Sequence, residues 1–300
     1  MPTEKKPAAA AASDRVAVRK TYKLYIGGAF PRSESGRVYP VADAQGRLLA
    51  QAAQASRKDV RDAVAAARAA FAGWSGATAY NRGQVLYRVA EMLEGRRAQF
   101  ADEVAAAEGV GAARAAADVD AAIDRLVWYA GWTDKYAQVS GGANPVAGPF
   151  VNYSVPEPTG VVAILAPQRS SLLGLVSVVA PAVAMGNATV VVSSFARPLP
   201  AISLAEVLAT SDLPGGVVNL LSGSAAELGP WLATHRDVNG VDVTGAEPGA
   251  RADLLRAAAD TVKRTYVPAG ADEEDWSPEP ALRRMAAFVE IKTVWHPLGI

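Results

Sequence analysis

The side chains that could act as nucleophiles, general bases or metal ligands are few and lie far apart in this sequence. Ser170 and Ser171 precede an apolar run that begins at Leu172. A nucleophilic serine needs a nearby base and often a Gly-x-Ser-x-Gly turn, and neither is present here, so we expect the pair to cap a helix from Leu172. His235 and His296 are the only histidines. Neither has local metal-ligand spacing, so we expect surface or packing roles for both.

Two further groups of residues have alternative interpretations. The acidic run at residues 272–275 could hold a cation, but glycine and proline residues surround it, which favours a solvated linker. Trp128, Tyr129 and Trp132 could stack on a ligand, although packing in a core or an interface is the commoner use of such residues. The sequence contains no cysteine, which excludes a thiol nucleophile, thiolate metal ligands and disulfides.

Length and composition favour a globular protein with an ample core. The chain has 300 residues, 50% of them hydrophobic, and its 30 basic and 30 acidic residues cancel. Because no net field attracts polyanions, neither nucleic acid nor an anionic membrane is an expected partner, whereas small molecules and other proteins are. The lack of cysteine gives no support to secretion, and we expect a cytoplasmic protein.

The longest apolar run does not predict a membrane span. It covers residues 172–185, is interrupted by Gly174 and Pro181, and is shorter than the roughly 20 residues that cross a bilayer. A buried helix is expected there instead. Residues 1–20 are basic and rich in alanine but lack the apolar core of a secretory signal, so they are predicted to be a disordered tail.

The pattern of apolar residues predicts an α/β fold. Short Val-rich runs alternate with helical stretches, which is typical of a parallel sheet buried on both faces. The predicted strands lie at residues 160–166, 188–193, 217–222, 238–244 and 262–267. We therefore expect an open, doubly wound parallel sheet of the Rossmann-like kind.

The remaining segments are predicted to flank this sheet. Residues 21–141 form a helical part, in which a hairpin precedes a capping box at Ser56 and Asp59. Apolar residues spaced from Leu86 to Val104 predict one continuous helix. The other expected parts are an extended arm at 142–159, the sheet at 160–268, an acidic linker at 269–280, and a last helix and strand at 281–300.

A series of motifs in a fixed order points to a known family. They are LYIGGAF, SRKDVRDAVAAARAAFAGW, WYAGWTDKY, EPTGVVAILAP, APAVAMGNATVVV, LPGGVVNLLSG, DVTG and FVEIKTVW. From about Tyr22 onward the chain resembles the NAD(P)-dependent aldehyde dehydrogenase superfamily. The resemblance implies a Rossmann-like cofactor domain and an oligomerisation arm. The last motif resembles the C-terminal strand of those enzymes but follows after a short linker, which implies that the family's catalytic domain, with its cysteine nucleophile, is missing. This arrangement is similar to the non-catalytic second half of two-module members.

The resemblance also implies that catalytic positions have changed. The family's Pro-Trp-Asn turn, whose amide faces the developing oxyanion, matches Pro167, Gln168 and Arg169 here. A long, charged arginine does not reproduce a short, fixed amide. The family's general base, a glutamate, aligns with Pro268, which cannot accept a proton.

The cofactor positions are only partly retained. The lysine and glutamate that hold the adenosine ribose in the family align with Val192 and Phe195. Another loop glycine is replaced by Ala225, which limits the close approach of a pyrophosphate. The resemblance keeps five candidate cofactor-binding residues: Pro167, Gly223, Gly229, Thr244 and Gly245. For the three glycines, an ordinary strand-to-helix turn is the alternative interpretation. It thus implies weakened binding of NAD or NADP and no other cofactor.

Two extended segments predict a role in assembly. They lie between Phe150 and Val155 and between Phe288 and Trp295, and unpaired strand edges of this kind are usually covered by pairing. By resemblance they form the oligomerisation hairpin, with a full-length aldehyde dehydrogenase subunit or a second copy as partner. The leading hypothesis is a non-catalytic subunit that stabilises or regulates an active relative. The alternatives are an NAD(P)-binding sensor and an aldehyde oxidoreductase that uses non-standard residues.

Overall fold

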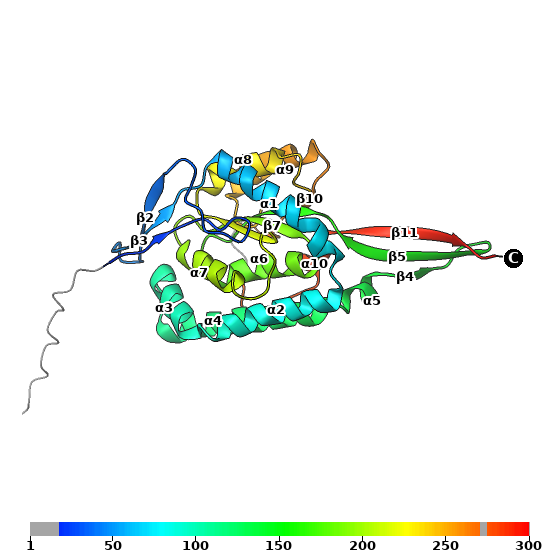
Figure 1. The fold of residues 1–300 in the computed structure, drawn as a ribbon, viewed down its shortest axis with the longest axis horizontal. Coiled ribbons are helices and arrows are strands. Elements are labelled where there is room, and N and C mark those ends of the chain that lie inside the picture. Colours follow the sequence, from blue (N-terminus) through cyan, green and yellow to red (C-terminus); the bar gives the residue numbers. More distant parts are fainter. Residues whose placement is uncertain (1–17, 271–274, 300) are drawn as a thin grey trace, which may run out of the picture.

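A five-stranded parallel sheet forms the centre of the molecule (Figure 1). The computed structural model describes residues 18–270 and 275–299. The strands follow the order β10-β9-β6-β7-β8, so the direction of winding reverses between β6 and β9. Their bounds are β6 (Val161–Leu165), β7 (Ala188–Val192), β8 (Val218–Leu221), β9 (Gly240–Asp242) and β10 (Arg264–Tyr266). The predicted open, doubly wound parallel sheet is confirmed.

Helices cover both faces of this sheet, as its continuous apolar strands require. One face carries α1 (Arg57–Gly76), α8 (Ala225–Thr234) and α9 (Pro248–Ala259). The other carries α6 (Leu173–Ala184), α7 (Leu199–Leu208) and α10 (Arg283–Ala287). An outer layer of α2 (Ala79–Glu94), α3 (Arg97–Glu108) and α4 (Ala112–Trp132) packs on α6 and α7.

Local sequence signals set several helix ends as expected. The predicted capping box is present, because the Ser56 side chain accepts from the Asp59 N–H while the Asp59 carboxylate accepts from the Ser56 N–H. Every residue of α6 is buried, which confirms the predicted buried helix. In the part of the chain that the structure describes, no helix combines the length and the apolarity needed to cross a membrane.

The second helical segment differs from the prediction of one continuous helix. It is divided into α2 and α3 at Gly95 and Arg96, where Arg96 leaves helical geometry with φ −114° and ψ 13°. The apolar spacing continues across the break because both helices bury side chains against the same core, Leu93 from α2 and Phe100 from α3. Periodicity therefore indicates burial correctly and misses the turn.

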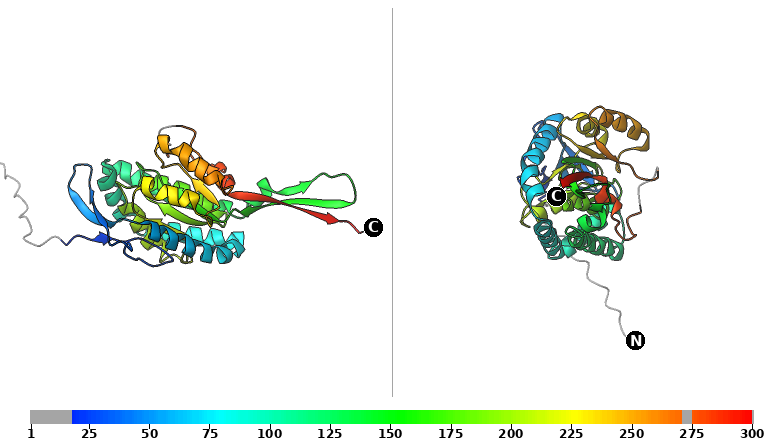
Figure 2. Two further views of the ribbon diagram at one scale, coloured as in Figure 1. Left: turned by 90° about the horizontal axis from the view of Figure 1, so that it is seen from above. Right: turned by 90° about the vertical axis from the view of Figure 1, so that its right-hand side faces the viewer.

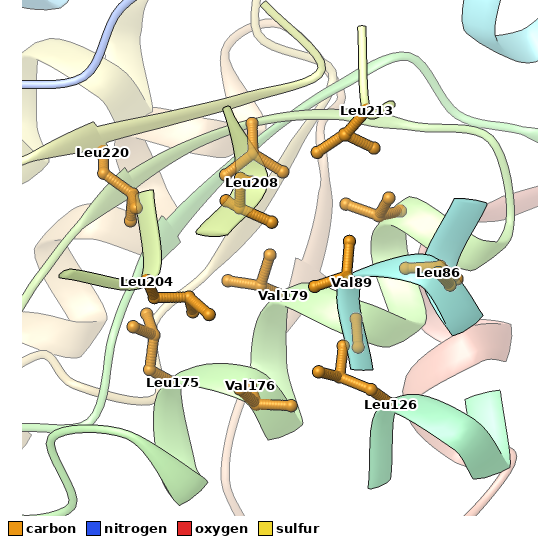
Figure 3. Close-up of a pocket in the computed structure, with 13 residues that line it drawn as sticks. Leu86, Val89, Leu126, Leu175, Val176, Val179, Leu204, Leu208, Leu213 and Leu220 are labelled. Atoms are coloured by element: carbon orange, nitrogen blue, oxygen red, sulfur yellow. The ribbon is translucent and has the colours of Figure 1, made fainter. Parts of the chain in front are cut away.

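Helices α2, α4, α6 and α7 surround a small apolar cavity beside β8 (Figure 3). Its volume is about 30 Å³ and its lining is entirely apolar, with Leu175, Leu204 and Leu220 among the side chains that surround it. A void of this kind is expected to stay dry, since it offers water no polar partner. It is a packing defect of the core.

A second, smaller sheet forms near the N-terminus. It comprises β1 (Thr21–Tyr22), β2 (Val38–Ala42) and β3 (Leu48–Ala53), and β2 and β3 pair antiparallel as the predicted hairpin. Beyond β1, Tyr25 forms an antiparallel bridge to Leu220 at the edge of the large sheet. The hairpin is thereby joined to the body. The predicted tail lies almost wholly outside the described residues.

A long arm projects from one end of the body (Figure 2). It is an antiparallel sheet of β4 (Gly142–Asn144), β5 (Phe150–Pro158) and β11 (Val289–Pro297), approached through the short helix α5 (Tyr136–Ser140). β5 and β11 pair along nine residues, from Pro158 with Val289 to Phe150 with Pro297. The two segments that are expected to need strand partners thus pair with each other, and β11 keeps one free edge.

The prediction of a solvated linker at 269–280 is wrong at one point. Residues 272–274 of the predicted acidic run lie outside the described residues, but Trp276 is only 8% exposed. Its carbonyl oxygen accepts a hydrogen bond from the buried Arg125 guanidinium (2.7 Å), and so does that of Pro278 (2.8 Å). The linker is therefore anchored to the body through α4.

Candidate functional site

The loops that follow the parallel strands meet at one edge of the sheet, because all carboxyl ends of parallel strands lie on the same side. Pro167 and Gln168 follow β6, Phe195 follows β7, Gly223 follows β8 and Gly245 follows β9. This edge, at the reversal between β6 and β9, is where open α/β sheets bind ligands. The structure thus brings the predicted loops together.

Gly245 allows two of these loops to cross in contact. Its N–H donates to the Leu165 carbonyl (2.8 Å), and a Cβ atom added to it would lie 1.8 Å from the Ala166 carbonyl oxygen. No side chain fits in that space. The glycine is required for packing whether or not a ligand binds.

The other two candidate glycines also have structural roles, one in the backbone conformation and one in packing. Gly223 has φ +154°, a backbone conformation that favours glycine. Gly229 lets α8 approach its neighbours, because an added Cβ would lie 3.2 Å from Leu165 Cδ1 and 3.4 Å from Leu254 Cδ2. It faces β6 and α9 inside the body, so its position is explained without a ligand.

A pocket opens at this edge between α8 and α9. Its volume is about 350 Å³, within the range of small-molecule sites. Of the predicted cofactor-binding residues, only Gly245 lines it. The full lining consists of Gln168, Phe195, Ser224, Ala225, Ala226, Pro230, Gly245, Ala246, Glu247, Ala250, Asp253, Leu254 and Ala257.

Phe195 stands at the margin of this pocket and is held from two sides. Its ring stacks on Tyr39 of β2, with centroids 4.6 Å apart and planes inclined by 10°. Its N–H donates to Gln168 Oε1 (3.1 Å), while Gln168 Nε2 donates to the Ala166 carbonyl (2.7 Å). Burial raises the pKa of the Tyr39 phenol. Gln168 therefore links the segment after β6 to the segment after β7.

Thr244 is turned away from the pocket. Its N–H and its hydroxyl both donate to Asp242 Oδ1, the former at 2.8 Å. The other Asp242 oxygen accepts from the Arg284 guanidinium (3.0 Å), and both charged side chains are buried. The sequence thus predicted a site role for a residue whose polar groups are used inside the body.

The Asp242–Arg284 pair belongs to a buried cluster that sequence reasoning missed. The Arg284 guanidinium lies over the Tyr266 ring at 4.1 Å and near the Trp276 ring at 5.1 Å. Burial raises the pKa of nearby Tyr129 to about 12. One signal was available, since Asp242 is a charged residue inside an otherwise apolar buried strand. Its partner, more than 40 residues away, carried no signal.

Trp276 lies near the start of α6. A Cβ atom added to Gly174, at the start of α6, would lie 2.9 Å from Trp276 Nε1 and 3.0 Å from Pro167 Cβ. The indole and Pro167 therefore both lie close to Gly174. Pro167 does not line the pocket.

The remaining chemical candidates have structural roles. The Ser170 hydroxyl accepts from the Gly174 N–H (2.9 Å), as expected of a helix cap, and the Ser171 hydroxyl donates to Glu108 Oε1 (2.7 Å). His235 Nδ1 accepts from the Asp237 N–H (3.2 Å), and burial lowers the pKa of this histidine. Residues 18–270 and 275–299 contain no group of three or more His, Cys, Asp or Glu side chains that could hold a metal ion.

The predicted aromatic group lies within one helix and its core. Trp128 and Tyr129 meet edge to face with centroids 5.0 Å apart, and Trp128 and Trp132 lie 5.6 Å apart. Tyr129 is 1% exposed and belongs to the main core cluster, against which the two tryptophans pack. The packing interpretation of these residues is confirmed.

Comparison with known proteins identifies the family. The model of the aldehyde dehydrogenase family matches residues 30–274. The chain belongs to this family. Cytosolic aldehyde dehydrogenase 1 of Elephantulus edwardii is 32% identical over 254 residues, which are 83% of this chain and 50% of the relative. Cytosolic 10-formyltetrahydrofolate dehydrogenase of Mus musculus is 31% identical over 85% of this chain and 29% of the relative. The chain therefore spans about half the length of the first of these relatives, and less of the second.

Solved structures of the aldehyde dehydrogenase family agree with the fold. HpcC from Thermus thermophilus matches with a TM-score of 0.78 and 32% identity, over 82% of this chain and 47% of that chain. An NAD⁺ complex of an aldehyde dehydrogenase from Bacillus cereus matches with a TM-score of 0.77 and 26% identity, over 82% and 50%. The predicted resemblance is confirmed, and with it the α/β fold class.

Proposed function

We propose that this chain is a non-catalytic member of the aldehyde dehydrogenase family that assembles with an active family member through its arm. The observation that carries the proposal is the free edge of β11. Only Val289 of its nine residues is buried, and β5 covers just one of its two edges. The chain thus contains a nine-residue strand that buries little of its surface against its own body.

The chemistry of the site supports a non-catalytic role. The sequence has no cysteine to form a thioester, and Pro268 and Arg169 stand where the family's base and oxyanion amide are expected. Among the described residues, the serines that could replace a thiol are engaged as a cap and as a partner of Glu108. We expect no aldehyde-dependent formation of NADH by the purified chain, and measurable turnover would contradict the proposal.

The surface of β11 is suited to strand addition. Ile291, Val294 and Trp295 are 51%, 46% and 58% exposed, and the main-chain groups of the free edge can extend a neighbour's sheet. Exposed edges with apolar side chains are normally protected or paired. A strand supplied by a full-length aldehyde dehydrogenase subunit, or by a second copy, would cover this edge.

The test is to measure association of the purified chain with a full-length aldehyde dehydrogenase from the same organism, by light scattering after size exclusion and by titration. We expect a stable complex, and we expect Val294→Lys to weaken it at least about tenfold, because a charge would be buried at the new strand pair. Val38→Lys is the matched control, since Val38 is 51% exposed on the edge strand β2 at the other end of the molecule. Assembly through the arm would be refuted if the chain stays monomeric in the presence of the partner, or if the two variants weaken the association equally.

Ligand sensing is a second candidate function, and the pocket between α8 and α9 is the observation that favours it. Relatives have been solved with NAD⁺, so NAD or NADP is the first ligand to test. Calorimetry with both dinucleotides at millimolar concentration checks this role. If neither NAD nor NADP gives a measurable heat of binding, dinucleotide sensing is refuted, and the proposal of assembly through the arm is unaffected.

A further inference from the structure

The strand that carries the free edge of the arm leaves the body through α10 (Figure 1). Phe288 follows the last residue of this short helix, and β11 begins at the next residue. The Phe288 carbonyl accepts from the Thr159 N–H (3.2 Å) and from Asn187 Nδ2 (3.0 Å), which ties the root of the arm to the body. The direction in which the arm extends therefore depends on how α10 is seated.

Two side chains at the ends of α10 contact the same strand of the sheet. At the carboxyl end of β9, Asp242 binds the Arg284 guanidinium (3.0 Å). At the other end of β9, a Cβ atom added to Gly240 would lie 2.7 Å from Phe288 Cδ1, so the ring packs directly on the backbone. One contact alone would let α10 pivot, whereas two contacts set its direction along β9.

The contact at the carboxyl end of β9 is both charged and buried. The side chains of Arg284 and Asp242 are 8% and 1% exposed. The guanidinium also lies over the Tyr266 ring at 4.1 Å and near the Trp276 ring at 5.1 Å. A planar guanidinium that stacks on a ring and binds a carboxylate is constrained in orientation as well as in position. Arg284 therefore limits the rotation of α10.

Buried ion pairs of this kind are a poor source of stability. The cost of taking two charges out of water offsets much of their attraction, and apolar side chains of similar volume often stabilise a fold as well or better. Asp242 nevertheless lies in a strand whose three residues are all buried. The pair is better explained by the single arrangement that it imposes on α10, since apolar contacts are not directional.

We propose that Asp242 and Arg284 are positioning residues for the arm, and that they hold β11 at the angle that a partner strand requires. Because both side chains are buried, they act on assembly only through α10. Loss of both charges leaves the body folded and lets the arm pivot about its root. The effect on assembly rests on the proposed function, whereas the effect on the orientation of the arm does not.

The orientation of the arm can be measured on the isolated chain. The sequence has no cysteine, so Tyr80→Cys on α2 and Leu298→Cys just beyond β11, both at exposed residues, provide two specific sites for spin labels. Pulsed electron paramagnetic resonance then gives the distribution of distances between the labels. We expect this distribution to become at least about twofold wider when Asp242→Asn and Arg284→Met are combined, because the directional contact is lost.

Two controls separate the orientation of the arm from general destabilisation. Combined Asp120→Asn and Arg97→Met remove an ion pair between α3 and α4, and should leave the distance distribution unchanged. Arg284→Lys keeps the charge but lacks the planar fork, so an intermediate width is expected. The midpoint of thermal unfolding of Asp242→Asn with Arg284→Met is expected within about 5 °C of that of the unsubstituted chain.

Association with a full-length aldehyde dehydrogenase is the second readout. We expect Asp242→Asn with Arg284→Met to weaken it at least about tenfold, because a mobile arm must be ordered on binding. An unchanged distance distribution in this variant and in Arg284→Lys, or equal broadening in the α3–α4 control, would overturn the positioning role. If the distribution widens but the unsubstituted chain binds no partner, the proposed function fails and the positioning role stands.

Discussion

Strands β6 and β11 lie in one molecule but differ in how they use their side chains. All five residues of β6 are buried between two layers of helices, whereas β11 buries only the first of its nine residues. The body is stabilised by its own packing, because helices cover both faces of the central sheet. The arm buries few side chains against the body, which is why it is the region proposed above to meet a partner.

The largest expected effect comes from the loop that crosses the centre of the body. Gly245→Ala would place a Cβ atom 1.8 Å from the Ala166 carbonyl oxygen, so the loops after β6 and β9 must separate. We expect a loss of unfolding free energy of at least about 3 kcal/mol, at the upper end for overpacked sites. Gly249→Ala is the control, since an added Cβ there meets nothing within 4 Å. Chemical denaturation of both variants measures the difference, and a stable Gly245→Ala protein would show that this loop can move.

A pair of matched truncations compares the two regions directly. Leu175→Ala enlarges the apolar cavity in Figure 3, where Leu175 is 2% exposed, and should cost about 2–5 kcal/mol of unfolding free energy. Ile291→Ala on the arm removes a side chain that is 51% exposed and should cost less than about 0.5 kcal/mol. Denaturation of the isolated chain provides both values. Similar losses would mean that the arm is packed against the body in solution.

The smallest effect concerns the ion pair at the base of the arm. Arg264 of β10 binds both carboxylate oxygens of Glu290 of β11, and this hydrogen bonding lowers the pKa of Glu290. A carboxylate whose pKa is lower in the folded state stabilises the fold above its unfolded pKa of about 4.3, and this stabilisation is lost as the pH falls through the folded pKa. The groups are partly exposed, so we expect less than about 1 kcal/mol.

Glu290→Gln should therefore reduce the unfolding free energy near neutral pH and flatten its decline below a pH of about 4.3. Comparison of denaturation at several pH values and salt concentrations checks this. Glu157→Gln is the matched control, because Glu157 pairs with Lys292 inside the arm and not with the body. If the pH dependence of the unfolding free energy flattens equally in Glu157→Gln, the ion pair between arm and body stabilises the fold no more than the pair within the arm.

Much of the fold could be predicted because local patterns carry it. The alternation of Val-rich runs with helical stretches indicated the parallel sheet, and Ser56 with Asp59 marked the start of α1. The same patterns failed at Gly95 and Arg96, where two helices share one apolar face. Periodicity reports which side chains are buried, and it does not report whether the backbone between them is continuous.

The candidate site was predicted less well, for a related reason. The sequence by itself indicated the family, the order of the strands along the chain and the absence of any cysteine in it, since these depend on local patterns and on the identity of single residues. The tertiary structure alone decided that Thr244 turns inward to Asp242, that Trp276 is buried, that β5 pairs with β11, and that a pocket lies beside Phe195. Each of these depends on contacts between segments far apart in the chain, and spacing along a sequence does not specify which distant surfaces will meet.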